Sequence, residues 1–244
     1  MRLKKFIPNI IKNLLINIRF AIKNPKLLQS KRLYKFTDEE LKFTHILEAF
    51  NYLKVAGVDG KIPSVFFEFG CHSGRTFATA MNSAHFLDVQ ECQFFAFDSF
   101  EGLPETNSQD GYFEEGTFFT DKENFKKIIK KKTNIELLDN QIIRGFYSDS
   151  LTDDLRRSLP KVGIIHIDVD LYSSTVEVLD FIKPLLVEGS LLLFDDWYCF
   201  PGGSLAGERK AFIEFCEQNP GFEFEEWKNY SNFGKSIFVT KINN

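Results

Sequence analysis

The stretch that decides the fold runs from Val162 to Trp197 and reads VGIIHIDVDLYSSTVEVLDFIKPLLVEGSLLLFDDW. Its first apolar run ends in Asp168 and Asp170, and its second, after an amphipathic segment, ends in Asp195 and Asp196. This pattern predicts a strand, a crossover helix and a second strand parallel to the first. Because ligands of open α/β sheets bind just outside the carboxyl ends of the strands, we expect all four carboxylates at one edge of the sheet.

Carboxylates crowded at one edge repel one another unless they are protonated or paired with a cation. A divalent metal ion is the simplest way to neutralise such a group. We therefore expect a metal site at this edge of the sheet.

The length and composition of the chain limit its class. With 244 residues, 43% of them hydrophobic, the chain suits one large α/β domain with an appendage. Its cysteines show no close spacing, which predicts reduced thiols in a reducing compartment, the cytoplasm, rather than disulfides or a zinc site. They are Cys71, Cys92, Cys199 and Cys216.

The charges are distributed unevenly. The net charge is −4, yet residues 1–36 hold ten of the 30 lysines and arginines and no acidic residue. We therefore interpret residues 1–36 as a basic N-terminal extension and residues 37–244 as the main domain. That domain carries the remaining 20 basic residues against 34 acidic ones, which argues against a nucleic-acid-binding protein.

Apolar residues recur at helical spacing over residues 6–22 and predict an amphipathic helix. Its longest apolar run, Leu14–Ile16, is too short for a membrane span of roughly 20 residues or for the apolar centre of a signal peptide. Residues 1–24 either lie on an anionic membrane surface, such as the inner face of the membrane, or pack on the domain or on a partner subunit. The second alternative is compatible with a homo-oligomer.

A further strand-to-helix unit lies earlier in the chain. The apolar run Ile62–Phe69 predicts a strand, which leads through Gly70–Thr76 into a helical segment ending at about Leu87. A glycine turn of this kind lets a ligand approach the backbone, and the helix start offers free N–H groups. An ordinary strand-to-helix turn would give the same pattern.

The run Cys92–Phe97 predicts the next strand, which ends in Asp98, 30 residues after Glu68. In nucleotide-binding folds an acid at this place binds the ribose hydroxyls, although it could also cap a turn or a helix. Together with the glycine turn, Asp98 favours an adenosine-binding site.

Further elements complete the predicted fold. Thr37 is expected to cap the helix that precedes the first strand, and the long polar loop Glu105–Thr120 is typical of a lid. A third strand is predicted over Gln141–Phe146, and a β-hairpin over Phe222–Trp227 and Ser236–Lys241. The result is an α/β fold with a seven-stranded, mostly parallel sheet, a C-terminal antiparallel hairpin and helices on both faces. This is the Rossmann-like topology of class I S-adenosylmethionine-dependent methyltransferases.

In five segments the sequence resembles the macrocin O-methyltransferase family, metal-dependent enzymes that methylate sugar hydroxyls in antibiotic biosynthesis. The segments are FEFGCHSGRT (67–76), FAFDSFEGLPE (95–105), GFYSDSL (145–151), IIHIDVDLYSST (164–175) and LLLFDDW (191–197). The resemblance covers roughly residues 60 to 215 and implies S-adenosylmethionine and Mg²⁺ as cofactors.

The resemblance also implies roles for individual residues. S-adenosylmethionine would be held by residues at the ends of the first three strands, namely Glu68, Gly70, Cys71, His72, Ser73, Asp98, Ser99, Gly145 and Phe146. Mg²⁺ would be bound by Asp168, Asp195 and Asp196. The acceptor would be a sugar hydroxyl, either on a deoxysugar of a natural product or on a sugar of a surface polysaccharide.

A base must remove the proton of the acceptor hydroxyl, whose ionised form a metal ion stabilises. Asp170 is our first candidate, because it lies two residues after Asp168 and would point the same way in a strand. Asp149 and His72 are the next candidates. Alternatively, Asp170 caps a helix or supports a metal ligand.

Two other functions fit parts of the sequence. The motif Asp168-Val169-Asp170 matches the D-x-D metal motif of glycosyltransferases, although that interpretation leaves Asp98 and Asp195-Asp196 without roles. A methyltransferase fold that has no activity and scaffolds a membrane complex is the non-enzymatic alternative.

Overall fold

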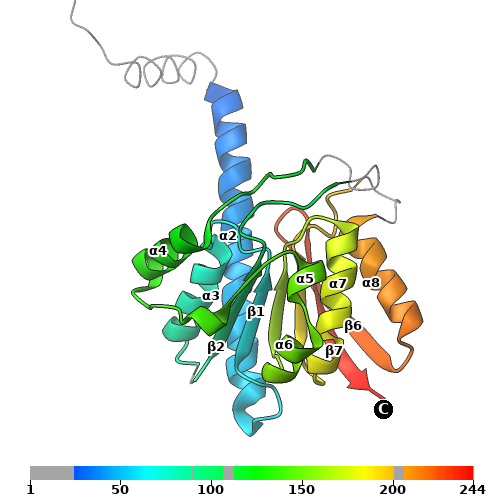
Figure 1. Ribbon diagram of the computed structural model, residues 1–244. Coiled ribbons are helices and arrows are strands. Elements are labelled where there is room, and N and C mark those ends of the chain that lie inside the picture. Colours follow the sequence, from blue (N-terminus) through cyan, green and yellow to red (C-terminus); the bar gives the residue numbers. More distant parts are fainter. Residues whose placement is uncertain (1–24, 90, 107–112, 201–205, 244) are drawn as a thin grey trace, which may run out of the picture.

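The computed structural model describes residues 25–89, 91–106, 113–200 and 206–243, with side chains from Asp38 onward (Figure 1). Within these residues a seven-stranded sheet forms the centre, in the order β3-β2-β1-β4-β5-β7-β6. The strands are β1 (Val65–Phe69), β2 (Gln93–Asp98), β3 (Ile142–Arg144), β4 (Ile164–Ile167), β5 (Leu191–Phe194), β6 (Phe222–Tyr230) and β7 (Gly234–Ile242). The first five are parallel, and β7 runs antiparallel to both of its neighbours. The predicted fold class is therefore confirmed.

Helices cover both faces of the sheet (Figure 1). They are α2 (Pro25–Ala56), α3 (Arg75–Phe86), α4 (Lys122–Thr133), α5 (Tyr147–Ser150), α6 (Asp153–Ser158), α7 (Tyr172–Ile182) and α8 (Gly207–Gln218), with short 3₁₀ turns at η1 (Gly57–Asp59), η2 (Asp139–Gln141) and η3 (Lys183–Leu185). The buried side chains of α2, α3 and α4 pack on one face of the sheet, and those of α7 and α8 pack on the other.

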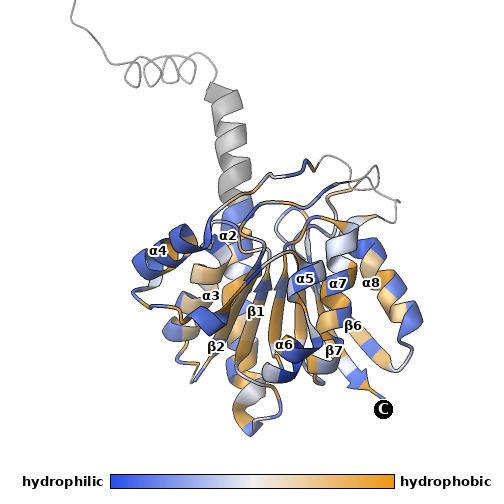
Figure 2. Ribbon diagram, viewed as in Figure 1, coloured by the Kyte–Doolittle hydropathy of each residue, from blue (hydrophilic) through white to orange (hydrophobic). Residues whose placement is uncertain are grey.

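The strands are apolar on both faces because both faces are covered. Figure 2 shows hydrophobic strands at the centre and hydrophilic residues on the outer surfaces of the helices. Successive residues of a strand point to opposite faces, so Phe66 joins the core under α2 while Phe67 joins the core under α7. The ring of Phe66 lies 5.7 Å from that of Phe50 and 6.0 Å from that of Phe77. Much of the high phenylalanine content is thus used to fill these two cores.

Helix α2 begins earlier than predicted. It starts at Pro25, so Thr37 lies inside the helix and the prediction that Thr37 caps it is wrong. No proline or glycine interrupts residues 26–36, and proline is well tolerated in a first turn, so the helix can extend back to Pro25. Asp38 does not cap the helix either: its carboxylate accepts a hydrogen bond of 2.9 Å from the Asn232 N–H, which ties α2 to the β6–β7 turn.

The extended helix carries the chain beyond the edge of the sheet where the parallel strands end (Figure 1). The proposed boundary between residues 36 and 37 therefore falls within α2. Among the described residues, no helix combines the length and the hydrophobicity that crossing a membrane requires. The amphipathic helix predicted over residues 6–22 lies outside the described residues.

Candidate functional site

A cavity of about 420 Å³ lies at the carboxyl ends of the parallel strands. Its walls come from the turns that follow β1, β2, β3, β4 and β5, from α2 and α7, and from both ends of the predicted lid loop. Residues that line the cavity include Lys42, Gly70, His72, Asp98, Ser99, Phe118, Gly145, Phe146, Asp168, Asp170, Asp195 and Asp196. The topology thus brings to one cavity residues that are far apart in the sequence.

At one end of the cavity, Asp98 organises the glycine turn. Its Oδ2 accepts hydrogen bonds from the N–H groups of Cys71 (2.8 Å) and His72 (2.9 Å), and its Oδ1 accepts one from the Phe100 N–H (2.7 Å). The turn-capping interpretation of Asp98 is therefore right. It does not exclude a ligand, because a carboxylate has about four acceptor positions and Asp98 also lines the cavity.

The nine predicted cofactor residues divide into two groups. Gly70, His72, Asp98, Ser99, Gly145 and Phe146 line the cavity, whereas Glu68, Cys71 and Ser73 do not. Glu68 is only 1% exposed and points into the core under α2, on the same face as its β4 neighbour His166. Burial raises the pKa of Glu68 well above its usual range. Cys71 contributes its N–H to Asp98, while its side chain is buried.

Gly70 is glycine for a reason that the sequence did not reveal. Its φ is +81°, and a Cβ atom there would lie 1.7 Å from the carbonyl oxygen of Asp168. The missing side chain therefore lets the turn after β1 pass directly against the turn after β4. Glycine is therefore required here by the contact with Asp168 and not by the approach of a ligand.

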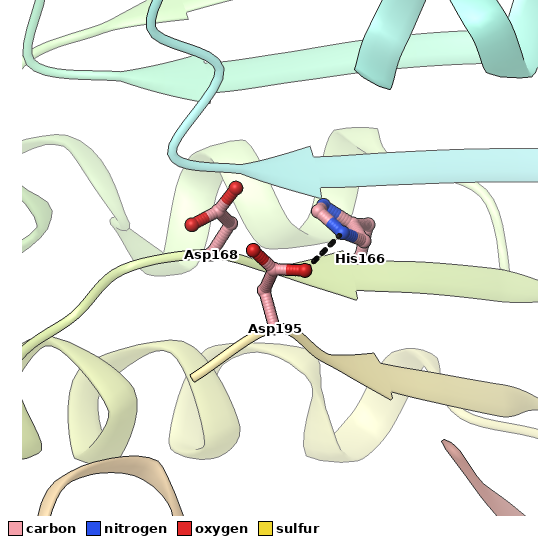
Figure 3. Close-up of side chains that lie close together, drawn as sticks. All are labelled: His166, Asp168 and Asp195. Atoms are coloured by element: carbon pink, nitrogen blue, oxygen red, sulfur yellow. Dashed lines mark ion pairs between the residues drawn. The ribbon is translucent and has the colours of Figure 1, made fainter. Parts of the chain in front are cut away.

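At the other end of the cavity, carboxylates gather as predicted. Ligand atoms of Asp168, Asp170 and Asp196 lie within 4.8 Å of one another, and those of His166, Asp168 and Asp195 form a second such group. Figure 3 shows the second group, in which His166 comes from β4 and the two aspartates follow β4 and β5. The Nε2 atom of His166 lies 3.8 Å from Oδ1 of Asp195, too far for a hydrogen bond.

Asp170 reaches this group by a different route from the predicted one. Strand β4 ends at Ile167, so neither Asp168 nor Asp170 belongs to a strand, and the argument from strand geometry is wrong. Instead, Asp170 adopts a left-handed conformation with φ of +60°, which is uncommon for a residue other than glycine. The tight turn brings its carboxylate beside Asp168 and Asp196. Strain of this kind concentrates at functional sites.

The carboxylates do not share the same electrostatic state. Burial, and then the charges of the neighbouring acids, raise the pKa of Asp168 well above its usual range and the pKa of Asp170 to about 9. The pKa of Asp196 is raised for the same reasons. Burial alone would also raise the pKa of Asp195, but the neighbouring His166 and Lys42 outweigh it and lower that pKa. The surroundings thus disfavour the ionised forms of Asp168, Asp170 and Asp196, and a further cation would favour them.

Two residues of this site were missed by the sequence analysis. The ammonium group of Lys42, on α2, contacts Oδ2 of Asp195. Glu208, at the start of α8, is fully buried and accepts a hydrogen bond of 2.9 Å from the Asp196 N–H. Neither residue belongs to a recognisable sequence motif. The available signals were the place of Lys42 on the helix α2 and the place of Glu208 in the first turn of α8.

One predicted residue lies elsewhere. Asp149, the second candidate for the base, is exposed on α5 and does not line the cavity. His72, the third candidate, lines the cavity with its ring 5.8 Å from that of Phe118. Asp170 is the candidate that lies among the carboxylates.

The strand order and the cavity at the carboxyl ends of the parallel strands define a class I methyltransferase fold. Solved methyltransferases share this fold at low sequence identity. The O-methyltransferase NovP superposes with a TM-score of 0.64 and 18% identity over 82% of this chain and 79% of its own. The calicheamicin methyltransferase CalS11 superposes with a TM-score of 0.60 and 17% identity over 98% of this chain and 96% of its own.

The chain belongs to the macrocin-O-methyltransferase (TylF) family, whose model matches residues 42–217. A related protein of Streptomyces niveus, demethyldecarbamoylnovobiocin O-methyltransferase, is 24% identical over 140 residues. That match covers 54% of this chain and 52% of the relative, so the chain spans about half the length of this curated relative. The resemblance seen in the sequence is therefore confirmed, and the glycosyltransferase interpretation of Asp168-Val169-Asp170 finds no support.

Proposed function

We propose that this protein is an S-adenosylmethionine-dependent, Mg²⁺-assisted O-methyltransferase that acts on a sugar hydroxyl. One observation carries the proposal. A single cavity has a turn organised by an acid that can bind a ribose at one end, and a group of crowded carboxylates at the other. A methyl donor and a metal-assisted acceptor need these two environments side by side.

The first end of the cavity fits S-adenosylmethionine. Asp98 keeps acceptor positions for the hydroxyls of a ribose, and its three N–H partners hold the carboxylate in place. Gly145 and Phe146 follow β3 and line the wall next to Asp98, since the Gly145 N–H donates to the Asp98 carbonyl (3.0 Å). Family membership supports the same donor.

The second end fits Mg²⁺. Asp168, Asp170 and Asp196 offer carboxylate oxygens, which are the ligands that Mg²⁺ prefers. In addition, Oδ2 of Asp196 is buried and has no hydrogen-bond partner among the described residues. A buried carboxylate oxygen without a partner is costly, and a bound cation would remove that cost. Asp168 and Asp196 of this group are two of the proposed ligands. The third, Asp195, lies in the second group, with Asp168 and His166, and also contacts Lys42.

When bound, Mg²⁺ would supply Lewis acidity to an acceptor hydroxyl, and the sulfonium would supply an activated methyl group. The residues of the chain then have three tasks. Asp98 and the glycine turn hold the donor in line with the acceptor. Asp170 takes the hydroxyl proton on its carboxylate, for which it must be ionised, and a nearby dication favours the ionised form. Glu208 and the thiol of Cys199, which donates to Oδ1 of Asp196 (2.7 Å), keep Asp196 in position.

A sugar is the acceptor that the relatives support. CalS11 is a TDP-rhamnose 3′-O-methyltransferase, and the family is named for macrocin methylation. Two neighbouring hydroxyls of a sugar could both face a metal site with open positions. A deoxysugar of a natural product and a sugar of a surface polysaccharide satisfy this requirement equally.

A methyl-transfer assay tests the proposal. Purified protein is incubated with S-adenosylmethionine and a panel of nucleotide sugars and glycans, with Mg²⁺ or with a chelator. We expect transfer to at least one sugar that is lost in chelator and restored by added Mg²⁺. Transfer that persists in chelator would exclude the metal-assisted mechanism. An inactive scaffold would show no transfer and, by calorimetry, no binding of S-adenosylmethionine.

A further inference from the structure

Lys42 stands apart from the other residues of the carboxylate group. It comes from α2, which lies outside the strand-and-turn units that supply the aspartates. Its ammonium group contacts Oδ2 of Asp195, and the two side chains are 20% and 9% exposed. Among the described residues that line the cavity, Lys42 is the one lysine or arginine. A single built-in cation thus faces four aspartates.

The contact is made by a helix that is held firmly in place. On the turn before Lys42, Glu39 binds Arg75 of α3 through two hydrogen bonds of 3.0 and 2.9 Å. On the turn after it, the ring of His45 stacks on Tyr230 at 4.4 Å. Further along, the Tyr52 hydroxyl donates to the Gly189 carbonyl (2.8 Å). Because α2 is anchored on both sides of Lys42, the ammonium group is presented at a defined place.

The charges explain why such a cation is useful. Asp168, Asp170, Asp195 and Asp196 carry four negative charges when ionised, and burying them together without cations is unfavourable. Lys42 supplies one positive charge, and a dication would supply two more. Lys42 is the part of this balance that belongs to the chain and is present before any ligand binds.

We propose that Lys42 is the resident counter-ion of Asp195, a positioning residue that keeps the carboxylates assembled before the dication arrives. This inference rests on the proposed function, because it assumes that the same carboxylates take up Mg²⁺. Lys42 and the dication are close cations in one site. They therefore repel each other. Lys42 thus lowers the affinity of the site for Mg²⁺, but it keeps the carboxylates in place before the metal binds.

The test compares the wild type with Lys42→Met, using metal-free protein and Mg²⁺ titrations at pH 8. Without metal, we expect the variant to melt about 5 °C or more below the wild type, because Asp195 has lost its buried partner. With Mg²⁺, we expect binding about tenfold tighter than in the wild type by calorimetry, because a competing positive charge is gone. Removing a residue that only stabilises the fold would not tighten the binding of Mg²⁺. Lys54→Met is the matched control: it removes a lysine of the same helix that bonds the Leu87 carbonyl, away from the cavity, and should leave Mg²⁺ affinity unchanged.

A double variant keeps the test decisive if Lys42→Met folds poorly. Lys42→Met combined with Asp195→Asn removes both charges, so we expect it to melt above Lys42→Met in the absence of metal. Failure of this rescue, equal melting of Lys42→Met and wild type, or weaker Mg²⁺ binding by Lys42→Met would each overturn the proposal. If the wild type itself binds no Mg²⁺, the metal in the proposed function is wrong, and the melting and rescue experiments still decide whether Lys42 is the counter-ion of Asp195.

Discussion

Each carboxylate around the cavity has a different set of partners, and those partners decide what it can do. Asp98 is held by three backbone N–H groups, so it is a rigid acceptor that faces a ligand. Asp195 neighbours His166 and is paired with Lys42, and together they lower its pKa. Asp196 keeps one buried oxygen without a hydrogen-bond partner among the described residues, and a bound cation would satisfy it. Identical side chains are given different chemistry by their neighbours.

The three N–H partners of Asp98 lead to a prediction for Asp98→Asn. An amide has one acceptor oxygen, and its NH₂ group faces N–H donors, so the turn loses charge-assisted hydrogen bonds. We expect a loss of about 2–4 kcal/mol in the free energy of unfolding and at least about 100-fold weaker binding of S-adenosylhomocysteine. Urea unfolding and calorimetry measure these effects. Asp121→Asn is the control, since Asp121 caps α4 through the Asn124 N–H (2.9 Å) and asparagine caps equally well.

His45 gives a pH prediction. Burial lowers its pKa to about 4, from about 6.5 in an unfolded chain, despite its contact with Glu48 (3.2 Å). Because the folded protein disfavours the charged ring, the stability that this neutral histidine contributes is present above about pH 6.5 and is lost as the pH falls toward 4. Between pH 7 and pH 5 the loss is about 2 kcal/mol.

The variant His45→Phe keeps an aromatic ring against Tyr230 but cannot be protonated. We therefore expect its free energy of unfolding, measured in urea at several pH values, to fall less steeply between pH 7 and pH 5 than that of the wild type. His85→Phe changes an exposed histidine and should keep the wild-type slope. Parallel curves for the wild type and His45→Phe would contradict the prediction.

At the scale of the elements, tight turns after the parallel strands build the site. The turn after β1 crosses the turn after β4 at Gly70, and the turn after β4 folds back at Asp170. Helix α2 then adds Lys42 from outside the parallel strands. The ends of β1 and β4 are thus held by direct backbone contact, and the carboxylates depend on that contact for their places.

Gly70→Ala should therefore damage both the fold and the metal site. The new Cβ would lie 1.7 Å from the Asp168 carbonyl oxygen, and φ of +81° adds strain for any L-residue. We expect a loss of about 3 kcal/mol or more in the free energy of unfolding. Gly60→Ala is the matched control, because φ is +73° but no atom lies within 4 Å of the added Cβ, so only about 1–2 kcal/mol is expected. Equal losses in the two variants would show that the contact with Asp168 is unimportant.

At the scale of the whole molecule, the parallel sheet places the two ends of the cavity on different strands. Asp98 is the last residue of β2, whereas Asp196 follows β5, and β1 and β4 separate these strands in the sheet. The two ends therefore share no side chain. The sheet is the rigid body that sets the distance between them.

This separation predicts that the two ligands stabilise the protein independently. In the wild type, S-adenosylhomocysteine and Mg²⁺ should each raise the melting temperature. Asp196→Asn should lose the shift caused by Mg²⁺ and keep the shift caused by S-adenosylhomocysteine, and Asp98→Asn should show the reverse. Thermal unfolding with each ligand alone measures this. Loss of both shifts in either variant would mean that the two ends are not separate sites.

The sequence by itself determined the fold class, the edge of the sheet where the site lies and most of its acids. This was possible because apolar runs that end in Asp98, Asp168 and Asp195 are local signals, and parallel strands place their carboxyl ends on the same side. Only the tertiary structure decided which groups neutralise those acids. Lys42 meets Asp195 across 153 positions of the chain, and no local pattern records such a contact. Pairing between distant side chains is set by how helices pack on the sheet. The contact between the turns after β1 and β4 likewise decides that Gly70 must be a glycine.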